Sequence, residues 1–147
     1  MSSTPSAVNL AATGHRRHSQ PLWPGLVHCV LNPAVTQVTI RTTICVSGWT
    51  ATARPPEGFT EPLKLQQIAA EGLPGPASAY EEDHRMPLEL GGSPADPENL
   101  SPEALAGAHS KDTAENAARA EVCGGADLLT VQAAFVVAWL APYPAYR

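Results

Sequence analysis

The sequence predicts one small α+β domain, and three observations lead to that class. Residues 36–46 are rich in β-branched side chains, which favour a strand. Residues 80–90 are predicted to form a short hairpin or a strand with a bent return, because Pro87 disfavours a central paired strand. Helix start and stop signals bound three further segments, at residues 60–72, 110–122 and 128–140.

The length of the chain, 147 residues, suits a single domain with tails. Residues 1–30 are polar, interrupted by proline and without periodicity, so we expect a disordered N-terminal tail. The domain is expected over residues 31–141, and residues 142–147 form a short C-terminal tail. Fifteen prolines and eleven glycines imply short elements joined by many loops.

Two kinds of secondary structure are open for residues 36–46. We expect a strand, and a short helix capped by Thr36 stays open as the alternative. Val38, Ile40 and Ile44 fit neither the two-residue repeat of a strand nor the repeat of a helix.

Each predicted helix has a capping residue at its start. Thr60 caps the first helix, which carries a proline in its first turn and ends at Gly72. Ser110 caps the second, which runs to about residue 122. Asp127 caps the third, which ends before the prolines that follow residue 140.

The chain is acidic, with a formal net charge of -5. Proteins that bind extended nucleic acid tightly usually present a basic surface, because neutralising phosphates dominates their affinity. The charge therefore counts against tight, extended DNA binding. It is compatible with a nuclease, since carboxylates that hold a metal add negative charge.

No membrane association is expected from the sequence. Residues 131–141 are strongly apolar, but this is only about half of the ~20 residues that a spanning helix needs. Residues 1–28 contain no apolar run long enough for a secretory signal, so a cytoplasmic location is the default expectation.

The three cysteines, Cys29, Cys45 and Cys123, leave at least one thiol unpaired in a monomer. If a disulfide forms, Cys45 with Cys123 is the preferred pair, because both lie inside the predicted domain. Such a bond would close a long loop and constrain the unfolded chain. Buried reduced thiols are the alternative.

The chemistry is concentrated in an ordered set of residues: Asp83 and His84 are adjacent, Asn99 follows His84 by fifteen positions, and His109 follows Asn99 by ten. In a strand the adjacent Asp83 and His84 point to opposite faces, so one can hold a metal while the other faces the attacking water. A neutral imidazole is a natural base near pH 7. An asparagine after a glycine- and proline-rich loop can brace that loop through its backbone. This set can support phosphodiester hydrolysis with one divalent ion.

The order Asp-His, Pro-Leu-x-Leu-Gly-Gly, Asn-Leu and His-x-Lys resembles the HNH endonuclease motif, whose fold is the ββα-metal hairpin plus helix. More narrowly, the chain is similar to a group of small actinobacterial proteins that are often exported. The shared stretches are Asn32-Pro33-Ala34-Val35-Thr36-Gln37, Thr43-Ile44-Cys45-Val46-Ser47-Gly48-Trp49, Arg54-Pro55-Pro56, Tyr80-Glu81-Glu82-Asp83-His84 and Lys111-Asp112.

The resemblance implies a role for each matching residue. His84 would be the general base and Asn99 the loop brace of the catalytic centre, while Asp83 and His109 would hold the metal. The ion would be Mg²⁺ first, with Mn²⁺, Ni²⁺ or Zn²⁺ as alternatives. The substrate would be nucleic acid, with DNA favoured over RNA.

Three charged residues are candidates for supporting roles. Glu81 shares a strand face with Asp83 and can help to hold the metal, Glu89 is a further candidate, and Lys111 can meet a phosphate. For each, a solvated surface charge is the alternative. An HNH-like interaction module without catalysis, or a metal-binding protein without nuclease action, is the alternative to the endonuclease.

Overall fold

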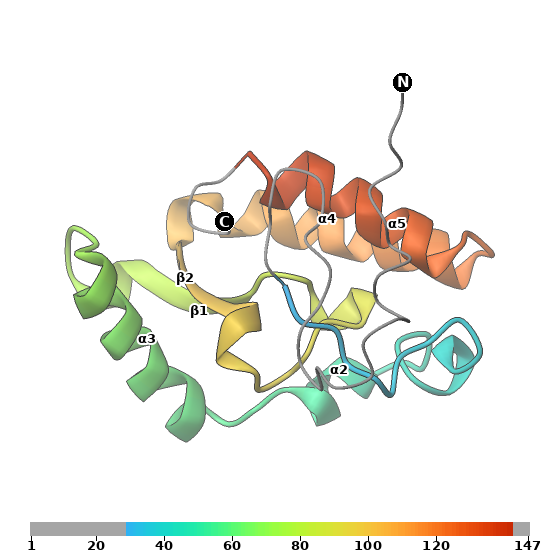
Figure 1. Cartoon of the computed structure of the whole chain (residues 1–147), viewed down its shortest axis with the longest axis horizontal. Coiled ribbons are helices and arrows are strands. Elements are labelled where there is room, and N and C mark those ends of the chain that lie inside the picture. Colours follow the sequence, from blue (N-terminus) through green and yellow to red (C-terminus); the bar gives the residue numbers. More distant parts are fainter. Residues whose placement is uncertain (1–28, 143–147) are drawn as a thin grey trace, which may run out of the picture.

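The structure is a computed structural model that describes residues 29–142. It is an α+β fold in which a two-stranded antiparallel sheet lies between helices (Figure 1). On one side of the sheet lies α3, and on the other side α4 and α5 run side by side. The helices and strands are α2 (Trp49–Ala53), α3 (Glu57–Glu71), β1 (Tyr80–His84), β2 (Leu100–Ala104), α4 (Leu105–Cys123) and α5 (Leu128–Phe135). Within residues 29–142 no helix is long and apolar enough to cross a membrane.

The hairpin pairs β1 with a strand later than the one expected. Tyr80 lies opposite Ala104 and His84 opposite Leu100, so the return strand is β2. The expected return within residues 80–90 is wrong, because the chain turns away at Pro87 into the 3₁₀ helix η3 (Leu88–Leu90). Residues 85–99 form one long loop, which ends in the 3₁₀ helix η4 (Pro97–Asn99).

The helix α4 begins at Leu105, directly after β2 and five residues before the predicted cap at Ser110. The predicted cap is therefore wrong, because the alanine-rich residues before Ser110 already favour helix. The stop at residues 124–125 was predicted correctly: the helix ends at Cys123 and Gly124 follows.

The helix α3 begins at Glu57, after the extended Pro56, and ends at Gly72 in the left-handed conformation. The predicted cap at Thr60 is wrong, and Pro62 lies inside the helix rather than in its first turn. The predicted end at Gly72 is confirmed. Two side chains fasten α3 to the hairpin: Lys64 Nζ donates to the Tyr80 carbonyl at 3.1 Å, and Gln67 Nε2 donates to the Leu100 carbonyl at 2.9 Å.

Residues 36–46 form successive turns around the 3₁₀ helix η1 (Ile40–Thr42), so the strand expectation is wrong. Threonine hydroxyls in this segment bond to nearby carbonyls: Thr39 Oγ1 donates to Ala34 O at 2.7 Å, and Thr43 Oγ1 to Thr39 O at 2.8 Å. These local bonds compete with strand pairing, and they explain why β-branched residues here form turns.

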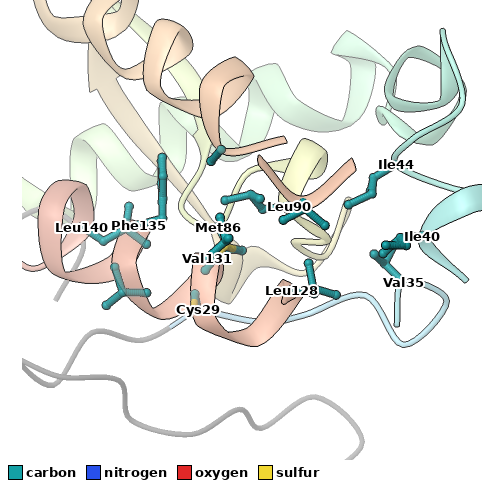
Figure 2. Close-up of a cluster of buried hydrophobic side chains, with 13 residues drawn as sticks. Cys29, Val35, Ile40, Ile44, Met86, Leu90, Leu128, Val131, Phe135 and Leu140 are labelled. Carbon is teal, nitrogen blue, oxygen red and sulfur yellow. The ribbon is translucent and has the colours of Figure 1, made fainter. Parts of the chain in front are cut away.

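The main core lies where α5 faces the loop after β1 and the turns of residues 29–46 (Figure 2). Met86 and Leu90 from the loop are fully buried there against residues of α5. Asp127 Oδ2 accepts a hydrogen bond from the Thr130 amide at 2.9 Å, which confirms the predicted cap of α5. After Phe135 the helix continues as a π-helical turn, η5 (Val136–Leu140), and it ends where the sequence predicts.

A disulfide joins Cys45 to Cys123, the pair preferred from the sequence. It ties the turns of residues 36–46 to the end of α4 across 78 residues of sequence. Arg119 Nε adds a second tie by donating to the Ile44 carbonyl at 2.6 Å. Cys29 is not part of a disulfide and is buried in the core.

The N-terminal boundary of the domain lies earlier than expected. Cys29 and Val30, assigned to the tail from the sequence, are each 2 % exposed. The rest of the expected N-terminal tail, residues 1–28, and residues 143–147 at the other end lie outside the described residues.

Candidate functional site

Asp83 and His84 end β1, where the chain leaves the hairpin for the loop of residues 85–99. Asn99 is the last loop residue, and it lies beside the loop's beginning because His84 pairs with Leu100. The Arg85 amide donates to the Asn99 carbonyl at 2.7 Å. Both ends of the loop therefore meet at the site. Along the chain, the site is built from β1, this loop, β2 and then α4.

The side chain of Asn99 is completely buried and bonds to the loop backbone. Its Nδ2 donates to the carbonyls of Met86 and Ser93, each at 3.0 Å. Its Oδ1 accepts from the Met86 amide at 2.9 Å. The amide thus uses both of its donor hydrogens and its acceptor, and this is the bracing role expected for Asn99.

The braced loop leaves room only for glycine at position 92. A Cβ atom at Gly92 would lie 1.8 Å from the Met86 carbonyl oxygen and 2.8 Å from Asn99 Nδ2. The neighbouring Ser93 amide donates to the Val30 carbonyl at 2.7 Å, so the first described residues also hold the loop. The second glycine of the motif, Gly92, is therefore explained by the close approach of the backbone and Asn99.

His84 is 5 % exposed, and its Nε2 lies 2.8 Å from the Pro94 carbonyl oxygen. A carbonyl only accepts, so Nε2 carries the proton and the neutral ring keeps its lone pair on Nδ1. Burial lowers the pKa of His84, and this outweighs the opposing effects of the Pro94 hydrogen bond and of Asp83. His84 is therefore a neutral imidazole of fixed tautomer near pH 7, the form that a general base needs.

Asp83 is engaged by a lysine from α4. Lys111 Nζ donates to Asp83 Oδ2 at 2.6 Å, to Glu115 Oε1 at 2.7 Å and to the His84 carbonyl at 3.0 Å. Burial alone would lower the pKa of Lys111, but Asp83 and Glu115 raise it and prevail. Lys111 is therefore a buried cation, and the structure does not place it in the pocket where it could meet a phosphate.

An open, acidic pocket lies over the end of β1. Arg54, at the end of α2, is the only lysine or arginine among its described lining residues. Six carboxylate residues line the pocket together with His84: Glu81, Glu82, Asp83, Glu89, Asp112 and Glu115.

Burial and mutual repulsion disfavour the charged form of several of these carboxylates. Burial raises the pKa of Glu81, and Asp83 and Asp112 raise it further. Burial also raises the pKa of Glu89, and it raises the pKa of Glu115 to about 7 despite the ion pair with Lys111. Ionising these carboxylates together is therefore costly, and a bound cation would favour their charged forms.

Glu82 points to the same face of β1 as His84, because strand residues two apart share a face. Both of its carboxylate oxygens are buried, and neither has a hydrogen-bond partner among the described residues. Burial raises the pKa of Glu82 to about 7, and Asp83 adds to this effect. The side chain lines both the acidic pocket and an adjoining pocket between β1 and α3, as do Arg54 and His84.

The structure does not bring His109 to this pocket. His109 is exposed on α4 and is not among the pocket's lining residues. Residues two apart on a helix lie about 200° apart around its axis, so the inward direction of Lys111 turns His109 outward. The expected pair of metal ligands, Asp83 and His109, is therefore not assembled.

The oxygen donors that are present suit a hard divalent ion such as Mg²⁺. They are the carboxylates of Asp83 and of its pocket neighbours Glu81 and Glu89. Within residues 29–142 no three His, Cys, Asp or Glu side chains meet closely enough to form a complete metal site. A divalent ion would thus need further ligands from water or substrate, as Mg²⁺ commonly does.

The sequence reasoning missed three residues of the site, namely Arg54, Glu82 and Glu115. For Glu115 a signal existed, because it follows Lys111 by four residues in a predicted helix. For Arg54 the only signal was its place in the shared Arg-Pro-Pro stretch. Glu82 likewise carried only its place in the stretch at residues 80–84, because its burial depends on α3 packing against the hairpin.

Neither a protein-family model, a curated protein nor a solved structure matches this chain. The geometry of the pocket therefore carries the functional inference. Three features define that geometry: a neutral His84 of fixed tautomer, a loop braced by Asn99, and an acidic lining that contains one arginine.

Proposed function

We propose that this chain is an HNH-like endonuclease that hydrolyses phosphodiester bonds, with DNA as the expected substrate and His84 as the general base. The observation that carries the proposal is the hydrogen bond of His84 Nε2 to the Pro94 carbonyl at 2.8 Å. This bond leaves Nδ1 unprotonated in a residue that lines the pocket, so the ring can accept a proton from an attacking water.

The acidic lining makes added divalent ion a requirement of the proposal. Six carboxylate residues and one arginine line the pocket, so a phosphodiester approaching it alone would be repelled. Asp83 and its neighbours Glu81 and Glu89 would hold the ion, which would offset the charge on the phosphate.

Three further residues have a defined part in this proposal. Arg54 is the pocket's own cation and would contact a phosphate oxygen. Asn99 keeps the loop in the shape that brings the Pro94 carbonyl to His84. Lys111 holds Asp83 in place by donating to its Oδ2.

The test is nicking of supercoiled plasmid DNA with Mg²⁺, Mn²⁺, Ni²⁺ or Zn²⁺ and with a chelator. We expect nicking with at least one ion, none with the chelator, and a loss of at least about a hundredfold in His84→Ala. Glu121→Gln, an exposed change on α4 outside the pocket, is the matched control. The proposal fails if no ion supports nicking or if His84→Ala keeps the wild-type rate.

A non-catalytic HNH-like module is the second candidate, and two observations favour it. Lys111 already bonds to Asp83, and His109 lies outside the pocket, so the motif lacks its expected second metal ligand. A module of this kind would bind nucleic acid or a protein without turnover. It predicts that His84→Ala leaves DNA binding unchanged in a gel-shift assay while no ion supports nicking by the wild type.

A further inference from the structure

The contact between α4 and the end of β1 is made by a buried ammonium group. Lys111 is 3 % exposed and lies on the inward face of α4 with Ala108 and Ala118. Its Nζ lies 2.6 Å from Asp83 Oδ2 and 2.7 Å from Glu115 Oε1. A third carboxylate, Glu103 on β2, lies 4.0 Å away.

The three hydrogens of this ammonium all have acceptors within the protein. Besides Asp83 and Glu115, it donates to the His84 carbonyl at 3.0 Å. An ammonium has three donors and no acceptor, so these contacts use its full capacity. Lys111 thus acts as a fixed internal charge that joins two strands and a helix.

We propose that the ammonium of Lys111 competes with a divalent ion for Asp83 and thereby weakens metal binding at the pocket. Only the location of the ion rests on the function proposed above. Two like charges that share one carboxylate repel each other, and one oxygen of Asp83 is already bonded to Lys111. A neutral residue at position 111 would remove this positive charge from beside Asp83 and Glu115.

The test is Mn²⁺ binding followed by electron paramagnetic resonance, without nucleic acid. Lys111→Met removes the charge and keeps much of the side-chain volume, and Lys111→Gln removes the charge and keeps donor hydrogens. We expect both to bind Mn²⁺ at least about tenfold more tightly than the wild type. Lys111→Arg, which keeps the charge, is expected to match the wild type, as is the exposed control Glu121→Gln.

The gain must depend on Asp83. Adding Asp83→Asn to Lys111→Met is expected to abolish the tighter binding, which assigns the effect to this carboxylate. If either neutral variant is unfolded by circular dichroism, Mn²⁺ is expected to restore its fold, because the ion takes the place of the lost cation.

Two results would overturn the inference. One is Mn²⁺ affinity in the folded neutral variants equal to or weaker than that of the wild type. The other is neutral variants that are unfolded and that Mn²⁺ does not refold. Neither result depends on nicking, so the failure of this inference is distinguishable from the failure of the nuclease proposal.

Discussion

The side chain of Asn99 holds both backbone groups of Met86, thirteen residues earlier in the chain. Its Oδ1 accepts from the Met86 amide at 2.9 Å, and its Nδ2 donates to the Met86 carbonyl at 3.0 Å. The same Nδ2 donates to the Ser93 carbonyl. One buried amide therefore sets the path of the loop that carries the Pro94 carbonyl to His84.

The first prediction concerns Asn99→Asp, which has almost the same shape. The change replaces the Nδ2 donor with an oxygen that faces two carbonyl oxygens. We expect a loss of about 3 kcal/mol in the free energy of unfolding, because buried acceptors lose their donor and a charge is buried. Urea unfolding followed by circular dichroism measures this loss.

The matched control for this change is the reverse substitution in the same loop, Asp96→Asn. Asp96 Oδ1 accepts from the Glu98 amide at the start of η4, a bond that an asparagine can also accept. We expect this control to change stability by less than about 0.5 kcal/mol. Equal stability of Asn99→Asp and the wild type would contradict the bracing role.

The second prediction concerns His109, which the HNH resemblance makes a metal ligand. The structure leaves it exposed and outside the pocket. We therefore expect His109→Ala to nick plasmid DNA within about twofold of the wild-type rate, in contrast to His84→Ala. Nicking assays over a range of metal concentrations check this. A loss that extra metal reverses would show instead that His109 reaches the ion.

The sequence predicted those elements of the fold whose signals are local. Asp127 caps α5, and Gly72 ends α3, because each acts on the backbone within one turn of itself. The start of α4 was missed, because β2 runs directly into the helix without a capping side chain. The strand expected at residues 36–46 failed because threonine hydroxyls satisfy the backbone locally.

For the site, the ordered motif led to the residues that converge at the end of β1. Asp83, His84 and Asn99 meet there because the hairpin register fixes them. The role of Lys111 depended on which face of α4 it occupies relative to His109. A helix predicted to start at Ser110 leaves His109 outside the helix, so this comparison could not be made. Once the helix begins at Leu105, a two-residue offset decides that Lys111 faces inward and His109 outward.

The third prediction concerns the disulfide between Cys45 and Cys123, which closes a loop across 78 residues. Cross-linking a loop of this length restricts the unfolded chain and stabilises the fold by about 4 kcal/mol. We expect the double variant Cys45→Ala/Cys123→Ala to lose stability of that order in urea unfolding. Thiol titration of the denatured, unreduced wild type should give one thiol, from Cys29, and three after reduction. Three thiols before reduction would contradict the bond.

The fourth prediction follows from Glu82, whose buried oxygens lack hydrogen-bond partners among the described residues. Its pKa is raised from 4.5 to about 7, chiefly by burial. The folded state therefore binds a proton more tightly than the unfolded state between these two values. The stabilisation from this protonation is fully present below pH 4.5 and is lost as the pH rises through 7.

Glu82→Gln removes this titration and should be most beneficial at alkaline pH. After discounting for the solvent that reaches the side chain, we expect the variant to gain roughly 1 kcal/mol over the wild type between about pH 5 and about pH 8. Urea unfolding at both pH values measures the gain, and the exposed Glu121→Gln corrects for the lost charge. If Glu82→Gln differs in stability from the wild type by the same amount at both pH values, the folded protein does not raise the pKa of Glu82. Its carboxylate would then be ionised in the folded state at both pH values, satisfied by water or a cation.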